Sequence, residues 1–387
     1  MILLEPNTAA RIAAGAYLVQ DTSISDLMAN NQELGCESQF DVGNSMAFSA
    51  STGLGRFQAI SGFGYIAPAT GTMRGEYLIA FRGTQLLPFD GLTDLDCRTT
   101  RADTGHHIHS GFKSTFETQP NGPGRDILRY FRGKDPTRVH IVGHSLGGAL
   151  ATLAAELVAG MGVSEVLLYT FGSPRVGNRG FAEALNGAVG PENIYRVFHP
   201  ADPVPMLPVF PFAHVPAGNA GYAIDPQSNM LVSVGRHSTV NSYVPGTAGT
   251  SWGGLRAGGR YVASHGEVER WLVNAALSGS FMGSASLLTM IGTALQWILV
   301  KVAQVAGSVV TIGFTALDRI ASILAAGMEL GIDVAIYVQA LVRAIFRFLG
   351  RTIATGVRLS TAFLRWVLGL LFNAISTVAN RAVNLLS

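Results

Sequence analysis

The chain has 387 residues, which is enough for one large domain and a second region. Hydrophobic residues make up 48% of it and charged residues 13%, about half the usual charged fraction of roughly 25%. This composition excludes a disordered chain and indicates contact with a membrane or with a partner protein. The formal charge is +2, and no basic run precedes residue 340, which argues against nucleic-acid binding.

Cysteine content and the first residues of the chain bear on its cellular location. Cys36 and Cys97 could form one bridge, but they make neither a disulfide framework nor a zinc cluster. Glu5 comes early, and no basic stretch precedes an apolar core, so we expect no secretory signal peptide. We therefore expect synthesis in the cytoplasm, then association with a membrane or export by a route that needs no signal peptide.

In chain order, the first predicted elements are a helix and a group of strands. Residues 8–20 have the pattern of an amphipathic helix that begins at Asn7 or Thr8. Residues 41–75 hold many Gly, Ser, Thr and Phe in short alternating stretches, which is typical of strands and turns. A clear strand follows at 76–81, and part of 114–132 is predicted to be helical.

From residue 76 to 200, strands alternate with helical patterns. Apolar runs predict strands at 139–142, 166–171 and 194–198, and residues 149–159 are rich in helix formers. This alternation predicts an α/β fold with a mostly parallel sheet flanked by helices. Thr84, Ser145 and Asp202 each follow a predicted strand, where such sheets collect their functional residues. The Gly-rich residues 216–260 are predicted to be irregular.

A G-x-S-x-G motif at 143–147 joins a predicted strand to a predicted helix, which is the setting of a nucleophile elbow. Such a turn leaves no room for side chains at Gly143 and Gly147, and it places the Ser145 hydroxyl above the sheet. A serine nucleophile also needs a base and an orienting carboxylate. Asp202 follows a strand and is fixed by flanking prolines, so we predict it as the acid. His214, His237 and His265 all remain possible bases.

The composition changes at about residue 278, and we divide the chain into 1–277 and an all-α region at 278–387. Residues 271–300 carry no charge. This stretch is longer than the ~20 residues that a helix needs to cross a bilayer. Beyond them, arginines at positions 343, 347, 351, 358 and 365 would share one face of a helix. That face either lies on anionic lipid or forms the solvated stripe of a helical bundle.

Residues 76–245 resemble the class 3 lipases, the fungal-type family within the α/β-hydrolases. Five ordered motifs carry the resemblance: Phe-Arg-Gly-Thr at 81–84, His-Ser-Gly-Phe at 109–112, the elbow at 143–147, Phe-Gly-Ser-Pro-Arg-Val-Gly-Asn at 171–178 and Asp-Pro-Val-Pro at 202–205. The resemblance implies Ser145 as nucleophile and Asp202 as triad acid, with Thr84 and Leu146 as the oxyanion hole. It places His214 in a structural segment. His237 is favoured as the base because an aromatic residue follows it, as in the family, but His265 remains the alternative, because its spacing from Asp202 is nearer that of the fungal members. His144 is then a neighbour of the serine and not the base.

The same resemblance places a lid near residues 85–93, where an apolar flap would shield the serine and open on lipid. We therefore expect a lipid ester hydrolase, either a triacylglycerol lipase or a phospholipase, that acts at a membrane through residues 280–387. Asp90, Asp94 and Asp96 lack the spacing of a calcium loop, so we expect neither metal nor cofactor. Some bacterial members of the family are antibacterial toxins, which would imply an immunity protein and a chaperone.

Two alternatives place the function in the C-terminal region. In one, residues 280–387 insert into membranes and form pores, while the lipase-like region is not catalytic. In the other, the helices pack on the hydrolase region as a cap that hides the serine.

Overall fold

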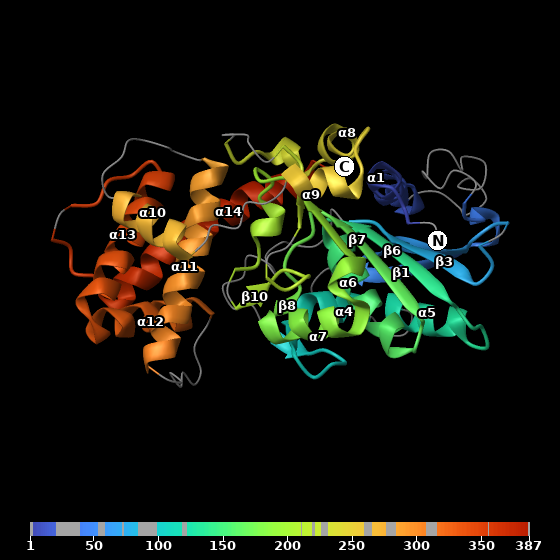
Figure 1. The fold of residues 1–387 in the computed structure, drawn as a ribbon, viewed down its shortest axis with the longest axis horizontal. Helices are drawn as coiled ribbons and strands as arrows, with labels where there is room; N and C mark the ends of the chain where they lie inside the picture. The colour runs from blue at the N-terminus through green and yellow to red at the C-terminus, as the bar shows by residue number, and fades with distance from the viewer. Residues whose placement is uncertain are drawn as a thin grey trace.

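The computed structural model describes residues 3–20, 39–52, 59–71, 73–83, 99–117, 122–209, 211–218, 221–225, 231–258, 265–275, 284–306, 316–354 and 356–385. Its centre is a sheet in the order β1-β2-β3-β6-β7-β9-β11 (Figure 1). The first two strands, β1 (Met46–Thr52) and β2 (Ala59–Pro68), are antiparallel, and β2 is antiparallel to β3 (Glu76–Phe81). From β3 onward the strands are parallel: β6 (Arg138–His144), β7 (Glu165–Phe171), β9 (Ile194–Phe198) and β11 (Tyr222–Ala223). The predicted α/β class with a mostly parallel sheet is confirmed.

Helices cover both faces of this sheet, and strand alternation decides which residues meet them. Leu78 and Ala80 of β3 belong to one apolar cluster, whereas Ile79 and Phe81 belong to another. Successive side chains of a strand point to opposite faces, so each cluster lies on one face. The first cluster packs against α1 (Pro6–Gly15), η1 (Ala16–Gln20), α8 (Val244–Gly246) and α9 (Trp252–Gly258). The second packs against α4 (Ser110–Phe116), α5 (Pro123–Phe131), α6 (Leu146–Gly160) and α7 (Arg179–Val189).

Smaller elements complete this part of the chain. A second sheet has the order β10-β8-β5-β4. Its strands are β4 (Thr99–Arg101), β5 (His107–His109), β8 (Gly177–Asn178) and β10 (Phe212–Ala213). Single turns of helix are η2 (Val42–Asn44), η3 (Pro191–Asn193), η4 (Val204–Met206) and η5 (Val234–His237), and η6 (Thr239–Tyr243) is π-helical. The segment predicted to be irregular, 216–260, therefore holds β11, η5, η6, α8 and α9.

The first helix begins two residues earlier than predicted. Pro6 starts α1 and Glu5 precedes it without a side-chain cap, so neither Asn7 nor Thr8 is the cap. Proline suits the first helical position because that residue needs no N–H partner. The Asn7 amide instead donates to the Val244 carbonyl at 2.8 Å, which ties α1 to α8.

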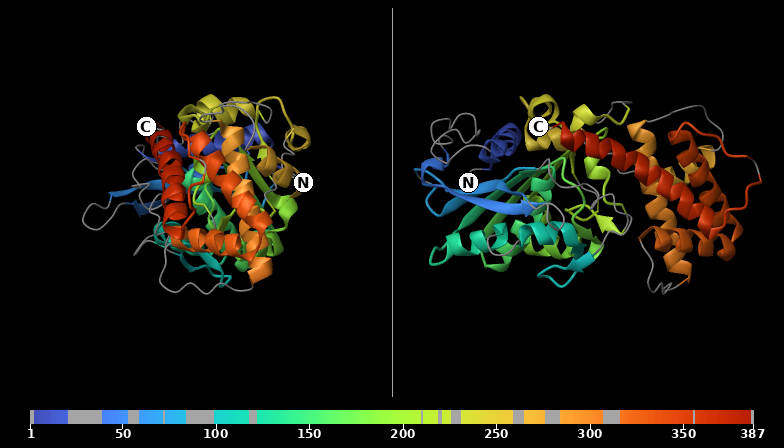
Figure 2. Two further views of the ribbon diagram at one scale, coloured as in Figure 1. Left: turned by 90° about the vertical axis from the view of Figure 1, so that its left-hand side faces the viewer. Right: turned by 180° about the vertical axis from the view of Figure 1, so that it is seen from behind.

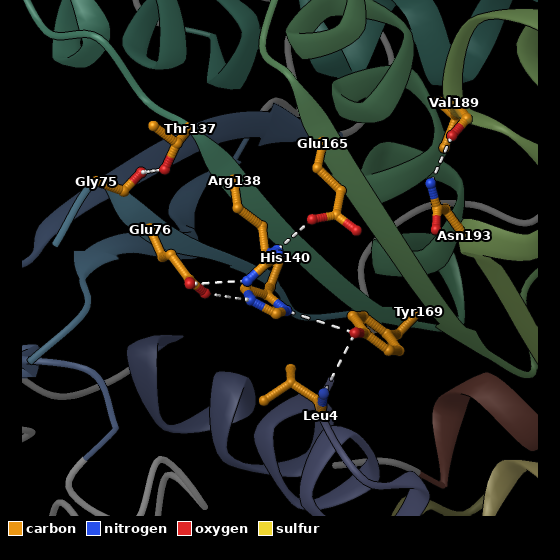
Figure 3. Close-up of polar contacts among 10 residues, drawn as sticks. All are labelled: Leu4, Gly75, Glu76, Thr137, Arg138, His140, Glu165, Tyr169, Val189 and Asn193. Carbon is orange, nitrogen blue, oxygen red and sulfur yellow. Dashed lines mark hydrogen bonds and ion pairs between the residues drawn. The ribbon is translucent and has the colours of Figure 1, made fainter. Parts of the chain in front are cut away.

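A charged network fixes the amino ends of the central strands (Figure 3). Arg138 of β6 forms ion pairs with Glu76 of β3 and Glu165 of β7. His140 lies 3.3 Å from Glu76 and 3.4 Å from the Tyr169 hydroxyl, which also accepts the Leu4 backbone N–H. Burial lowers the pKa of His140 more than the contact with Glu76 raises it. This edge is opposite the elbow, so the network fastens the N-terminal segment to the sheet away from the site.

The C-terminal region is helical: α10 (His265–Ala275), α11 (Ala285–Ala306), α12 (Ala316–Leu330), α13 (Ile332–Phe348) and α14 (Thr361–Asn384). Although α10 falls within 1–277, it packs against α11 and α13. The last helix, α14, contacts α12 and α13 and also reaches η4 and η5 of the sheet region. In Figure 2 this helix runs from the helical region to the sheet region, and the C-terminus lies beside the latter.

The prediction that the five arginines at 343–365 share one face of a single helix is wrong. α13 ends at Phe348, so Arg351 and Arg358 lie in the connection before α14. Gly350 has φ 65°, a left-handed conformation that glycine adopts without strain. The Arg351 N–H donates to the Phe346 carbonyl, and the Gly350 N–H donates to Arg347. This pair of bonds is the Schellman motif that ends helices at glycine. Gly350 is the sequence signal for this helix end, and the prediction from the arginine spacing did not take it into account.

Candidate active site

Ser145 lies in a strained turn between β6 and α6. Its φ is 57° and its ψ is −130°, which a residue with a side chain rarely adopts. A Cβ on Gly143 would lie 2.2 Å from the Gly147 carbonyl oxygen, and a Cβ on Gly147 would lie 2.6 Å from Arg82 backbone atoms. Glycine is therefore required on both sides of the serine, as the motif predicted. Strain of this kind persists where surrounding structure enforces it, and it is typical of functional positions.

The structure brings Ser145, His237 and Asp202 together. The Ser145 Oγ is 2.8 Å from His237 Nε2, and His237 Nδ1 is 2.8 Å from Asp202 Oδ2. With Nδ1–H donating to the carboxylate, Nε2 is free of its proton and accepts the serine hydroxyl. Each of the three side chains is at most 1% exposed. The other candidate base, His265, is the first residue of α10 in the helical region.

Asp202 is held by two further donors. The Val204 N–H donates to its Oδ1 at 2.9 Å, and the Tyr243 hydroxyl donates to its Oδ2 at 2.6 Å. Burial, followed by the charge of Asp202, raises the pKa of Tyr243, so its proton stays in this bond. A Cβ on Gly172 would lie 2.9 Å from both Asp202 Oδ2 and the Tyr243 hydroxyl, so only glycine fits there. Tyr243 was not predicted as a site residue, although the aromatic residue after His237 was noted.

The motif at 171–178 acts on the loop that follows Asp202. The Arg175 backbone N–H donates to the Leu207 carbonyl at 2.8 Å, and its guanidinium Nη1 donates to the Pro208 carbonyl at 2.9 Å. A second bond from Nη1 goes to the Met206 carbonyl. Three bonds from one arginine therefore fix the backbone at the end of η4 and just beyond it.

His144 packs beside the serine, at a ring-centroid distance of 4.5 Å from His237. Its Nε2–H donates to the His237 backbone carbonyl at 2.8 Å, and its Nδ1 accepts the Tyr17 hydroxyl at 2.8 Å. Burial lowers the pKa of His144 well below its usual value, and the neighbouring His237 adds to this. His144 thus stays neutral and steadies the segment that carries His237. Tyr17 lies on η1, which the sequence did not connect to the site.

Other predicted residues have different outcomes. Leu146, whose N–H was predicted for the oxyanion hole, is the first residue of α6 and is buried. His214 is buried too, and burial lowers its pKa well below the usual value. Thr84, the flap at 85–93, the aspartates at 90, 94 and 96, and both cysteines lie outside the described residues. Among the described residues, no group of three His, Cys, Asp or Glu side chains is placed to hold a metal ion.

The last helix packs against elements that carry or adjoin the site. Ser145 and His237 are fully buried, and α14 packs against η5, which carries His237, and against η4, which follows Asp202.

Residues 78–212 match the model of a known family, lipase (class 3). A secreted mono- and diacylglycerol lipase of Fusarium solani is 35% identical over 150 residues, which are 38% of this chain and 44% of the relative. Another secreted mono- and diacylglycerol lipase, from Malassezia globosa, is 29% identical over 147 residues, 35% of this chain and 48% of that protein. The chain thus spans less than half the length of each of these two relatives.

Solved lipase structures are also similar. The lipase of Rhizopus microsporus var. chinensis aligns with a TM-score of 0.40 at 23% identity, over 56% of this chain and 72% of that one. Lipase II of Rhizopus niveus aligns with a TM-score of 0.40 at 24% identity, over 56% and 78%.

Proposed function

We propose that the protein hydrolyses carboxylic esters of lipids with Ser145 as the nucleophile, since residues 78–212 match the family model of the class 3 lipases. The observation that carries the proposal is the hydrogen-bonded series from Ser145 Oγ through His237 to Asp202, with both distances at 2.8 Å. A nucleophile, a base and an orienting carboxylate in this order are the arrangement that activates a serine.

The proposed reaction has two halves. Ser145 Oγ attacks the ester carbonyl while His237 Nε2 takes the serine proton and passes it to the leaving alcohol. Asp202 holds the tautomer of His237 and stabilises the imidazolium, and Tyr243 holds Asp202. Water then attacks the acyl-enzyme with His237 again as the base, and this step releases the fatty acid. The Leu146 N–H at the start of α6, together with Thr84, would stabilise the oxyanion, and each such donor contributes about 2.7–4 kcal/mol.

Acylglycerols are the substrate class favoured by the comparisons, because the relatives of Fusarium solani and Malassezia globosa are named mono- and diacylglycerol lipases. Phospholipids carry the same ester bonds and would be met at a membrane. To test both, purified protein is incubated with mixed acylglycerols and phospholipids, and the released products are identified by mass.

The decisive variant is Ser145→Ala, with Ser114→Ala on the exposed surface of α4 as its control. We expect Ser145→Ala to abolish fatty-acid release and labelling by a fluorophosphonate, and Ser114→Ala to retain both. Labelling of another serine, or release that survives Ser145→Ala, would overturn the proposal.

We also propose that the helical region associates with membranes. Residues 285–303 of α11 and all of α14 are long and apolar enough to cross a bilayer, but about half of each is buried in the protein. Val357 and Trp366 are 38% and 49% exposed, and Arg343, Arg351 and Arg358 are exposed as well. Exposed aromatic and cationic side chains together suit a surface of anionic lipid.

The pore-forming alternative makes a different prediction for the same vesicles. If the helices perforate bilayers, Ser145→Ala protein will release a trapped dye as fast as the wild type. If hydrolysis is the activity, leakage requires Ser145 and follows fatty-acid release. A Trp366→Ala variant should then bind anionic vesicles more weakly while hydrolysing a soluble short-chain ester normally.

A role as an antibacterial toxin would be one specific use of the proposed hydrolase activity. It predicts that the chain directed to the periplasm of a bacterium stops growth and that the Ser145→Ala chain does not. Growth that is unaffected by the active protein would remove the toxin role, and with it the expected immunity protein, without affecting the hydrolase.

A further inference from the structure

Tyr17 reaches the site from a distant part of the chain. It lies on η1, and its hydroxyl oxygen is 2.8 Å from His144 Nδ1. A Cβ on Gly83 would lie 2.2 Å from this hydroxyl and 3.0 Å from the Ser145 Cβ. The Tyr17 hydroxyl is therefore close to the backbone that leads into Thr84, the predicted oxyanion-hole residue, as well as to the histidine beside the nucleophile.

The direction of the hydrogen bonds follows from the His237 carbonyl, which can only accept. The proton of the neutral His144 ring therefore lies on Nε2, which donates to this carbonyl at 2.8 Å. Nδ1 of the same ring is then an acceptor, and the Tyr17 hydroxyl is its donor. Burial, the largest cause, raises the pKa of Tyr17, so the hydroxyl keeps this proton. One continuous series thus runs from the tyrosine through the imidazole to the backbone of the base.

The backbone of η1 is held by packing and does not depend on the tyrosine hydroxyl. Val19 is buried, and a Cβ on Gly62 of β2 would lie 2.3 Å from the Val19 carbonyl oxygen, so η1 lies directly on the sheet. The Arg82 guanidinium donates to the Gly62 carbonyl and, at 2.8 Å, to the Gly83 carbonyl. The same arginine thus fixes the strand beneath η1 and the backbone beside Tyr17.

We propose that Tyr17 is a positioning residue of the active site, which links the Gly83 backbone to the backbone of the base through His144. This role rests on the proposed hydrolase function, in which the His237 ring takes the serine proton and passes it to the leaving alcohol. His237 is held at two points, its ring by Asp202 and its carbonyl by His144. Tyr17 secures the second point, because it is the donor that satisfies the other nitrogen of the His144 ring.

Removal of the Tyr17 hydroxyl alone would leave a buried acceptor, His144 Nδ1, without its donor. A buried polar atom without a partner is unfavourable, so the ring gains free energy if it turns toward another donor. Such a turn takes its Nε2–H away from the His237 carbonyl. Since Tyr17→Phe keeps the aromatic ring, the variant acts on this hydrogen-bond series and preserves the packing of η1.

The test is a double-mutant cycle in the full chain, with Tyr17→Phe, His144→Leu and the double variant assayed on a soluble short-chain ester. We expect Tyr17→Phe to lower kcat about tenfold while KM stays within about twofold, because the base acts in the chemical step. If the tyrosine acts through His144, the double variant should be no slower than His144→Leu alone. The control is Tyr130→Phe on α5, a partly buried tyrosine that should retain full kcat.

Histidine nitrogen chemical shifts give a second readout, which does not depend on catalysis. In the wild type we expect ¹⁵N NMR to show His144 with a protonated Nε2 and an Nδ1 that accepts a hydrogen bond. Tyr17→Phe should shift the Nδ1 signal of His144 and also the ring signals of His237, which the tyrosine does not touch. Tyr130→Phe should leave both sets of signals unchanged.

Two kinetic results would overturn the proposal. Wild-type kcat in Tyr17→Phe would mean that the hydroxyl does not position the base, and losses that multiply in the double variant would mean that it does not act through His144. Thermal unfolding reports whether each variant is folded. If the double variant is not, unchanged His237 signals in Tyr17→Phe contradict the proposal. A wild type that releases no fatty acid and is not labelled at Ser145 refutes the hydrolase itself, whereas the nitrogen shifts still decide whether Tyr17 holds His144.

Discussion

The sheet region and the helical region of this chain differ in what they bury. Among the described residues, the buried polar or charged side chains of the helical region are Ser284 and Ser376 alone. In the sheet region, Arg82, Asp202 and several histidines are buried. Asp202 and Ser145 are buried within the candidate active site. Burial of a polar group is unfavourable unless it finds a partner, so such groups concentrate where a function or an anchor needs them. The two regions therefore call for different tests, one of chemistry and one of packing.

The largest expected effect is on kcat, and it comes from replacing a histidine of the sheet region, His237, and not one of the helical region, His265. His237→Ala should lower kcat for a short-chain ester by about 10⁴-fold, because the serine loses its base. His265→Ala, in α10 of the helical region, should change kcat less than about twofold. Both variants are compared with the wild type at matched folded concentration. The assignment of the base to the sheet region fails if His265→Ala is the inactive variant.

Packing in the helical region is tested by Phe372→Ala. Phe372 is 4% exposed on α14 and lies in the apolar cluster that also contains α6 residues. Removal of a buried phenyl ring should lower the free energy of unfolding by about 3–5 kcal/mol, measured by guanidinium titration. Trp366→Ala, half exposed on the same helix, should cost about 1 kcal/mol or less. A similar cost for both would mean that α14 is not packed as described.

An intermediate effect is expected at Tyr243, whose hydroxyl donates to Asp202. Tyr243→Phe removes a hydrogen bond to a charged acceptor, which contributes about 1.5–3 kcal/mol. The expected result is a fall in kcat/KM of roughly 10- to 100-fold at a temperature where the variant is folded, together with a lower thermal midpoint, because the lost bond is buried. Tyr130→Phe on α5 is the matched control and should retain full activity. Full activity of Tyr243→Phe would show that Val204 suffices to hold Asp202.

The difference between the sheet region and the helical region also explains which features could be predicted from the sequence. The strand ends could be predicted from the apolar runs. The 143–147 turn could be predicted because its close backbone approaches leave room only for glycine at positions 143 and 147. Tyr17 and Tyr243 were not assigned, because their hydroxyls meet His144 and Asp202 only after distant segments pack together. In the helical region, composition predicted helices but not their ends, and the arginine spacing concealed the stop at Gly350. Local rules act over a few residues, whereas these contacts depend on the complete fold.

The smallest effect is a pH dependence of stability that arises in the sheet region. Burial lowers the pKa of His140, His144, His199 and His214, so the unfolded chain binds more protons below its histidine pKa of about 6.5. The free energy of unfolding should therefore fall from pH 7.5 to pH 5.5, by up to about 1.4 kcal/mol for each such histidine. Urea titrations at the two pH values measure the difference. His140→Gln should reduce it by one such increment, whereas His106→Gln, at an exposed turn, is the control. An unchanged difference in His140→Gln would mean that Glu76 compensates the burial of that ring.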